Sequence, residues 1–411
     1  MQDVKGRVLR VMVADDSAVM RGIMRTLFAT HAEDIDSELP AMVICGEASD
    51  GVECLEIVRR TQPDVLLLDL EMPRMHGLGV LDRLRAESPE LPELPVIMCS
   101  AYTELGARLT VDALARGASD YVMKPSVQSD FSRALKVLSE QLLPKIAALA
   151  VNPRRRCEAG HVEKRGMSKE RLISGSLNPR TEIVVIGIST GGPSALEVML
   201  SKLPADFPVP MLIVQHMPKL FTGALAERLD RCCALQVKEA YEGAVPEAGT
   251  VWIAQGDMHM EVRTAPRPLF SKPNIDEARI CLHESQPVNY CRPSVDLLFH
   301  SAADVYRHGT LALLMTGMGS DGVAGARSVH EFGGRIWAQD KASSAVWGMP
   351  GRLMQTGLVD SLIPLMLLGD ELTRQAWMGR RKREEVDTQQ RFAATADGGM
   401  MRGLEAVDGL F

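Results

Sequence analysis

The sequence lacks the features that are typical of membrane, secreted and nucleic-acid-binding proteins. Its longest apolar runs, such as residues 65–68 and 311–315, are much shorter than the roughly 20 residues that cross a bilayer. The 46 Lys and Arg residues are outnumbered by 53 Asp and Glu residues, and the formal net charge of -7 does not favour a partner bound through its phosphates. No signal peptide and no solenoid repeat is apparent. We therefore expect a cytoplasmic protein without membrane insertion and without a nucleic-acid partner.

The 8 cysteines are not arranged for metal binding either. They form no CxxC pair and no Cys/His pair at the spacing of metal ligands. They stand at positions 45, 54, 99, 157, 232, 233, 281 and 291. In a cytoplasmic chain this pattern predicts reduced thiols that are mostly buried.

The first third of the chain alternates between strand and helix patterns. Short apolar runs are separated by amphipathic stretches such as residues 51–61, which is typical of βα units on a parallel sheet. The apolar runs are at residues 8–14, 42–45, 65–68, 96–99 and 120–123. The pattern predicts a small doubly wound α/β domain over residues 1–143.

The 411 residues leave room for a second domain. A basic stretch without hydrophobic period predicts a linker over residues 144–180. Beyond it, apolar runs that indicate further strands are at residues 183–188, 211–216, 251–254 and 310–317. We expect a second doubly wound α/β domain over residues 181–373 and a mobile tail over residues 374–411.

Polar residues follow the predicted strands of the first domain. Asp15 and Asp16 come directly after the first strand, Asp69 after the third, Ser100 after the fourth and Lys124 after the fifth. Each aspartate alone could simply cap the helix that follows it. Together they should meet where the carboxyl ends of parallel strands converge, and clustered carboxylates suit Mg²⁺ and aspartyl-phosphate chemistry.

The same residues carry a resemblance to the flavodoxin-like receiver domain of bacterial two-component response regulators. The segments VADDSAVMR, VLLLDLEMPRMHGL, PVIMCSA and GASDYVMKP match that family. The resemblance implies that Asp69 accepts the phosphoryl group. It also implies that Asp16, Asp69 and the backbone carbonyl of Glu71 bind Mg²⁺, with Asp15 supporting the metal site.

The resemblance further implies a switch that responds to phosphorylation. Lys124 would pair with the phosphoryl group, Ser100 would hydrogen-bond it and move inward, and Tyr121 stands at the position of the family's switch aromatic. Phosphorylation would then act as a local charge change on a two-state element. A histidine kinase is the implied phosphodonor.

A second set of polar residues follows strands of the second domain. Ser189 lies in GISTG, which matches the G-x-S-x-G turn that exposes a nucleophilic hydroxyl beside the start of a helix. By itself this turn fits a phosphate-binding loop equally well, although it lacks G-x-G-x-x-G and G-K-[ST]. His216 and Asp321 follow two further strands; alone, the first fits a structural histidine and the second a helix cap. All three together predict an acyl-transfer triad at one sheet edge.

The triad and the first domain together resemble the chemotaxis protein-glutamate methylesterase family. The matching segments are IGISTGGPSAL, IVQHMPKLFTGALAERLD, RPSVDLLFHSAA, LLMTGMGSDGVAGA and AQDKASSAVWGMP. The family implies a Rossmann-like esterase domain in which Ser189 is the nucleophile, His216 the base and then acid, and Asp321 the orienting carboxylate. The backbone N–H of Met318 would contribute to the oxyanion hole, and Thr190 would help to shape the turn.

The resemblance also implies the reaction and its control. The substrates would be γ-glutamyl methyl esters on chemoreceptors, hydrolysed to glutamate and methanol, and glutamine deamidation would follow the same route. The esterase reaction would need no cofactor, and phosphorylation of Asp69 would release a receiver that covers the site. Two other classes stay open on the residues alone: a response regulator whose output domain acts by binding, for instance DNA, and a nucleotide-binding Rossmann-type enzyme.

Overall fold

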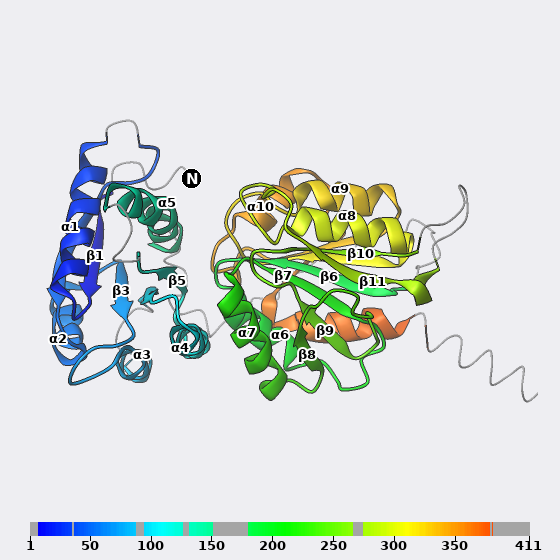
Figure 1. Ribbon diagram of the computed structural model, residues 1–411, viewed down its shortest axis with the longest axis horizontal. Coiled ribbons are helices and arrows are strands. Elements are labelled where there is room, and N and C mark those ends of the chain that lie inside the picture. The colour runs from blue at the N-terminus through cyan, green and yellow to red at the C-terminus, as the bar shows by residue number, and fades with distance from the viewer. Residues whose placement is uncertain are drawn as a thin grey trace, which may run out of the picture.

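The computed structural model describes residues 7–34, 37–87, 94–125, 131–150, 180–265, 274–378 and 380. Figure 1 shows them as two α/β domains, each with a parallel sheet between helices. The predicted fold class is confirmed. No helix within these ranges is long and apolar enough to cross a membrane.

The N-terminal domain is a parallel sheet with the strand order β2-β1-β3-β4-β5. Its strands are β1 (Leu9–Ala14), β2 (Met42–Ala48), β3 (Val65–Asp69), β4 (Val96–Ser100) and β5 (Asp120–Met123). Its helices are α1 (Ala18–Glu33), α2 (Gly51–Thr61), α3 (Gly77–Ala86), α4 (Glu104–Ala115) and α5 (Phe131–Ala150). All five expected strands form, because continuous apolar runs such as β3 can be buried on both faces of a sheet.

The last helix of this domain is longer than the sequence suggested. The predicted linker begins at residue 144, but α5 continues through Pro144 to Ala150. Ile146 and Leu149 are buried in the same hydrophobic cluster as the strands. The expected boundary at residue 143 therefore lies inside a helix, because the apolar period of α5 continues past the proline.

The C-terminal domain is built on a larger sheet with the order β14-β13-β12-β6-β7-β9-β8, in which every pair of neighbours is parallel. Its strands are β6 (Ile183–Ile188), β7 (Met211–Gln215), β8 (Gln236–Glu239), β9 (Thr250–Ile253), β12 (Thr310–Leu314), β13 (Arg335–Gln339) and β14 (Ser361–Ile363). β10 (His259–Arg263) and β11 (Arg279–His283) form a separate antiparallel pair. The four strands expected from apolar runs are present, and the others went unpredicted because their sequences are short and carry polar residues.

Helices cover both faces of this sheet. They are α6 (Gly192–Leu200), α7 (Lys219–Cys232), α8 (Val295–Tyr306), α9 (Val323–Glu331) and α10 (Met349–Gln355), with short 3-10 turns η2 (Ile275–Glu277) and η3 (Arg307–Gly309). A further helix spans residues 365–378. It crosses the expected domain end at residue 373: Ala376 is buried, and the Gln375 amide donates to the Thr181 hydroxyl at 3.4 Å. The remaining linker and tail, residues 151–179 and 381–411, lie outside the described residues.

The two domains contact each other through α4, which packs against α6 and α7 (Figure 1). The Tyr121 ring of β5 stacks on the Phe221 ring of α7, with 4.8 Å between ring centroids and 12° between planes. The Ser194 hydroxyl donates to the Leu114 carbonyl at 2.7 Å. Val346 of the second domain belongs to the same buried hydrophobic cluster as the core around α5. The interface is thus continuous with both cores.

Candidate active site

The acidic residues of the N-terminal domain converge at the carboxyl ends of its strands, as expected. One carboxylate oxygen from each of Asp15, Asp16 and Asp69 lies within 4.8 Å of the other two. Lys124 Nζ lies 2.8 Å from Asp15 Oδ2 and 2.8 Å from Asp69 Oδ1. Asp16 and Glu71 also line an adjoining cleft of about 520 Å³. The sheet edge therefore brings three carboxylates and one ammonium group together.

The charges of this cluster are not balanced by the protein alone. Burial raises the pKa of the Asp69 carboxyl to about 6, and the Asp15 carboxylate adds to that effect against the opposing pull of Lys124. Two cations, Lys124 and the Arg21 guanidinium that donates to the Asp15 and Asp16 carbonyls, stand against three carboxylates. Oxygen ligands of this kind are those that Mg²⁺ prefers. This acidic pocket is consistent with a magnesium site.

Two predicted switch residues, Ser100 and Tyr121, have their observed contacts with groups other than Asp69. Ser100 is fully buried and its hydroxyl lies 3.3 Å from the Gly106 carbonyl, while it accepts a hydrogen bond of 2.7 Å from Thr110. Tyr121 is buried against Phe221 of the other domain. Ser100 therefore contacts α4, and Tyr121 lies at the domain interface.

Ser189 lies where β6 turns into α6. Its N–H donates to the Thr316 carbonyl at 3.0 Å, which fixes it between β6 and the end of β12. The turn requires glycine: Gly191 has φ +76°, and a Cβ there would lie 2.5 Å from the Ala345 methyl. Ser189 is half-buried and stands beside the N-terminus of a helix, as the G-x-S-x-G pattern predicts.

His216 follows the neighbouring strand β7 and lies beside Ser189. Its N–H donates to the Ile188 carbonyl at 3.2 Å, and the Gln215 amide donates to the Ser189 carbonyl at 3.0 Å. The His216 ring turns its Nε2 to Asp321 Oδ2 at 2.9 Å. Its other nitrogen, Nδ1, is therefore the atom left for a substrate or a nucleophile. No hydrogen bond joins the Ser189 hydroxyl to His216 among the described residues.

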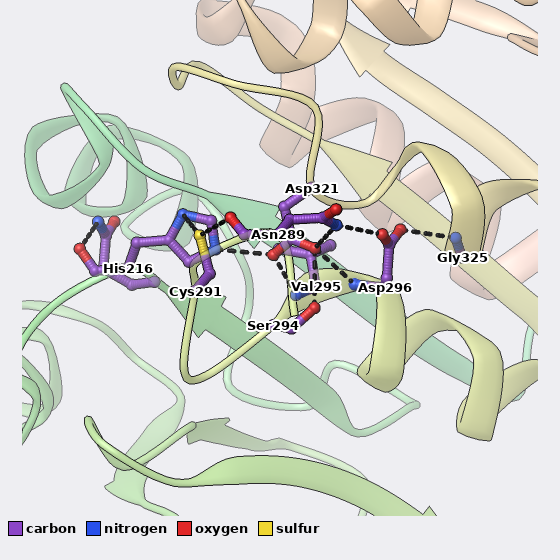
Figure 2. A network of polar contacts seen from close by, with 9 residues as sticks. His216, Asn289, Cys291, Ser294, Val295, Asp296, Asp321 and Gly325 are labelled. Carbon is purple, nitrogen blue, oxygen red and sulfur yellow. Dashed lines mark hydrogen bonds and ion pairs between the residues drawn. The ribbon is translucent and has the colours of Figure 1, made fainter. Parts of the chain in front are cut away.

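Asp321 is the most strongly hydrogen-bonded residue of the site, as Figure 2 shows. In addition to His216, it accepts from the Ser294 hydroxyl at 2.8 Å, the Asn289 amide at 3.1 Å and two backbone N–H groups at the start of α8. Burial by itself raises the pKa of this carboxyl, but the His216 pair and these donors outweigh burial and lower it to about 2. The carboxylate is thus held ionised and in one orientation.

The charged Asp321 in turn affects the pKa of His216. Burial lowers the pKa of an imidazole, yet the hydrogen bond to Asp321, together with the nearby Cys291 thiol, outweighs this and raises the pKa of His216 above its ordinary value. The parts of an acyl-transfer site are an orienting carboxylate, an imidazole with one nitrogen turned away from that carboxylate, and a serine on the adjacent strand end.

A further layer of residues around Asp321 was not predicted. The Asn289 amide bridges Asp321 and Asp296, with 2.7 Å to Asp296 Oδ2. Asp296 also accepts from the Gly325 N–H at 2.7 Å, which ties the site to α9. The segment RPSVDLLFH held a signal for Ser294 and Asp296, because it puts polar residues at the start of a buried helix. Asn289 had no such signal.

The two remaining predicted residues lie beside Ser189. The Thr190 carbonyl accepts from the Thr316 hydroxyl at 2.9 Å, which fixes the turn. Gly317 packs so tightly on Ser189 that a Cβ there would lie 2.8 Å from the serine Cβ. Within the described part of the chain, the N–H of the next residue, Met318, is not used by any hydrogen bond. It is available to an oxyanion close to Ser189.

The cysteine prediction is wrong in one respect. Among the seven cysteines that the structure describes, only Cys54 and Cys99 are buried, and none is in a disulfide. Cys291 is half-buried, and its Sγ lies 3.9 Å from His216 Nδ1. The loop that carries Cys291 is far from His216 in the sequence, so spacing could not indicate this contact. Cys157 lies outside the described residues.

The N-terminal domain carries an acidic pocket on a small parallel sheet, and the second α/β domain carries a cluster of Ser, His and Asp. Together they define a receiver-regulated hydrolase. Comparisons with known proteins agree. Residues 11–136 match the family "Response regulator receiver domain" and residues 184–372 match "CheB methylesterase". The chain belongs to the CheB family of protein-glutamate methylesterases/protein-glutamine glutaminases, and it is accordingly a chemotaxis hydrolase with a response-regulator receiver.

The relatives match over most of their length. A protein-glutamate methylesterase/protein-glutamine glutaminase of Trichodesmium erythraeum is 38% identical over 369 residues, which cover 89% of this chain and 98% of the relative. One of Pyrococcus horikoshii is 40% identical over 361 residues, or 88% of this chain and 91% of the relative. The crystal structure of the Thermotoga maritima CheB methylesterase catalytic domain is 38% identical with a TM-score of 0.44, and it covers 48% of this chain and 99% of that one.

Proposed function

We propose that this protein acts in the cytoplasm on chemoreceptors, where it hydrolyses γ-glutamyl methyl esters to glutamate and methanol and deamidates glutamines. The observation that carries this proposal is the His216–Asp321 pair, which commits His216 Nε2 to the carboxylate and leaves Nδ1, 3.9 Å from the Cys291 thiol, as the ring nitrogen that can take a proton. A buried ionised carboxylate, an oriented imidazole and the hydroxyl of a half-buried serine together supply orientation, base and nucleophile.

The proposed reaction begins with the Ser189 hydroxyl. Its oxygen attacks the ester carbonyl while His216 Nδ1 takes the proton, and the Met318 N–H stabilises the oxyanion. His216 then gives the proton to the leaving methoxide, which departs as methanol. Water repeats the sequence on the acyl group, and glutamine differs only in that ammonia leaves. The positive end of α6 favours the developing negative charge.

We propose that the receiver domain controls the esterase site through the contacts between the two domains. Asp69 would accept a phosphoryl group from a histidine kinase, with Mg²⁺ held by Asp16, Asp69 and the Glu71 carbonyl and supported by Asp15. When bound, the metal would neutralise charge on the phosphoryl oxygens. Lys124 would pair with the phosphoryl group, and Ser100 and Tyr121 would relay the change to α4. Release of α4 from α6 and α7 would uncover the esterase site.

Ser189→Ala tests the catalytic assignment. Methanol release from methylated receptor should fall by about 10³-fold or more, since the nucleophile is lost while binding is kept. Ser201→Ala, on an exposed serine at the end of the same helix, is the matched control and should keep the normal rate. Unchanged release by Ser189→Ala would contradict the triad and favour an output domain that works by binding.

Asp69→Asn tests the regulatory assignment. A small-molecule phosphodonor with Mg²⁺ should stimulate methanol release by the unaltered protein and should fail to stimulate the variant. Chelation of Mg²⁺ should remove the stimulation and leave the basal rate. Asp82→Asn is the control, because Asp82 is an acid of the same domain that pairs with Arg116. Stimulation of Asp69→Asn equal to that of the unaltered protein would refute the phosphoacceptor role.

A further inference from the structure

His216 and Cys291 form a pair of metal-ligating groups inside the esterase site. Cys291 Sγ lies 3.9 Å from His216 Nδ1, and one ligand atom from each of His216, Cys291 and Asp321 lies within 4.8 Å of the others. Both side chains are partly accessible, with the His216 side chain 15% exposed. The proposed reaction uses the imidazole but has no role for the thiol.

We propose that His216 Nδ1 and Cys291 Sγ bind Zn²⁺ reversibly and that the bound ion blocks the esterase. Zinc bonds to imidazole nitrogen at about 2.1 Å and to thiolate sulfur at about 2.3 Å, so tetrahedral ligands of these two kinds stand about 3.6 Å apart. The observed separation of 3.9 Å requires only a few tenths of an ångström of adjustment. The thiol loses its proton to solvent when the metal binds.

Asp321 belongs to the outer shell of this site. Its two oxygens already accept hydrogen bonds from His216, Ser294, Asn289 and the start of α8, so neither is free for a metal. By accepting the Nε2 proton of His216, it fixes the tautomer in which Nδ1 carries the lone pair. Carboxylate, histidine and metal in this order are the usual outer-shell arrangement of zinc sites. Water would fill the remaining positions.

The functional consequence rests on the proposed esterase function. A metal on Nδ1 occupies the atom that takes the proton of Ser189, so bound zinc and hydrolysis are mutually exclusive. Mg²⁺ is a hard cation and does not favour imidazole and thiolate ligands. The two sites would thus respond to different cations: Mg²⁺ at Asp69 and Zn²⁺ at His216.

Binding is tested first, without reference to activity. Co²⁺ is added to the full-length protein, and the thiolate-to-cobalt absorption band in the near ultraviolet is recorded and then displaced by Zn²⁺. The band should be lost in Cys291→Ser and in His216→Gln. The adjacent Cys232 and Cys233 form a second thiol pair, so the double variant Cys232→Ser/Cys233→Ser is the matched control and should keep the band. A band that survives in Cys291→Ser would overturn the site.

Asp321→Asn tests the outer shell. Its affinity for Zn²⁺ should fall by about 10- to 100-fold, as is typical when the carboxylate behind a histidine ligand is altered. Circular dichroism checks that the variant is folded. An unchanged affinity in a folded variant would contradict the proposed geometry.

Inhibition is tested by zinc titration of methanol release, with each variant compared to its own metal-free rate. Zinc should inhibit the unaltered protein and the Cys232→Ser/Cys233→Ser variant at the same concentration, and Mg²⁺ should not. Cys291→Ser should need at least about tenfold more zinc, because one of two protein ligands is missing. Equal sensitivity of Cys291→Ser would refute the proposal. If no methanol release is found at all, the esterase assignment fails while the cobalt band still reports on the metal site.

Discussion

Both domains have carboxylates at the carboxyl edge of a parallel sheet, but the pKa of the central carboxyl is raised in one site and lowered in the other. In the receiver, Lys124 pairs with two of the three aspartates, Asp15 and Asp69, and the pKa of Asp69 is raised to about 6, first by burial. In the esterase, five donors surround Asp321, and its pKa is lowered to about 2 although burial opposes this. Both carboxyls are buried, so the direction follows from their partners: His216 and the other donors at Asp321, against Lys124 and the like charge of Asp15 at Asp69.

The difference corresponds to what each site has to do. The role proposed for Asp69, acceptance of a phosphoryl group beside a cation, needs a carboxylate with few fixed partners, and Asp69 has only the Lys124 ammonium group and the Glu71 N–H as donors. A carboxylate that orients an imidazole must not move, and Asp321 is fixed by groups from β7, α8 and the loop around residue 289. The receiver site thus has carboxylate oxygens that can bind a cation, whereas the oxygens of Asp321 are already hydrogen-bonded within the chain.

Asp321→Asn should cause the largest loss of activity, because it removes the carboxylate that distinguishes the esterase site from the receiver site. The amide donates a proton where the carboxylate accepted one, so His216 loses its tautomer and orientation, and kcat should fall by about 10⁴-fold. The measurement is methanol release from methylated receptor. Asp304→Asn, on the exposed side of α8, is the control and should keep the normal rate. A loss below about tenfold would show that His216 does not depend on Asp321.

Ser294→Ala should sharpen the distinction between the two serines. It removes one of the five donors to Asp321, and a hydrogen bond to a charged group contributes about 1.5–3 kcal/mol, so kcat/KM should fall by about 10- to 100-fold. Ser294 is fully buried and contacts the carboxylate, so it acts as a positioning residue. The accompanying readout is the acid limb of the pH profile, which should move to higher pH, because Asp321 with one donor fewer is a stronger acceptor for the His216 proton. If Ser294→Ala abolished turnover and Ser189→Ala did not, the roles of the serines would be reversed.

The pH dependence of kcat/KM should report on the His216–Asp321 pair. Only neutral His216 can take a proton, and its pKa is raised above the ordinary histidine value, so activity is lost as pH falls through that raised pKa. Below it, kcat/KM should fall about tenfold per pH unit. The profile is measured in chelator-treated protein without phosphodonor. An acid limb at or below pH of about 6.5 would contradict the charge stabilisation by Asp321.

Asp112→Asn should have the smallest effect and tests the contact between the domains. Arg228 pairs with Asp112 of the receiver at 2.9 Å and with Glu197 of its own domain at 3.1 Å. Such a partly exposed pair contributes about 0.2–1 kcal/mol, so the basal esterase rate without phosphodonor should rise by up to about fivefold. Glu197→Gln removes the partner within the esterase domain and is the matched control. A basal rate of Asp112→Asn that is unchanged or lower would contradict inhibition by docking.

Much of the fold followed from local pattern. Helix α2 covers the predicted residues 51–61, and the apolar runs became the central strands of both sheets, because buried parallel strands need continuous hydrophobic residues. Strands such as β8 and β14 did not follow, since each is short, lies at a sheet edge and carries polar residues. The predicted linker start at residue 144 lies inside α5, since the hydrophobic period of this helix continues past Pro144.

The sequence by itself determined which chemical groups stand at the strand ends: the aspartates and Lys124 of the receiver, and Ser189, His216 and Asp321 of the esterase. Most of these residues end a strand or follow one directly, and Asp321 follows β12 through a short Gly-rich turn, so their positions are set by short-range pattern. Only the tertiary structure decided the hydrogen bonds of Asp321, the direction of the His216 ring and the contact with Cys291, 75 residues away. Such contacts depend on how a distant loop packs, which local periodicity does not encode. That packing decides which carboxylate stays open to a cation and which is fixed.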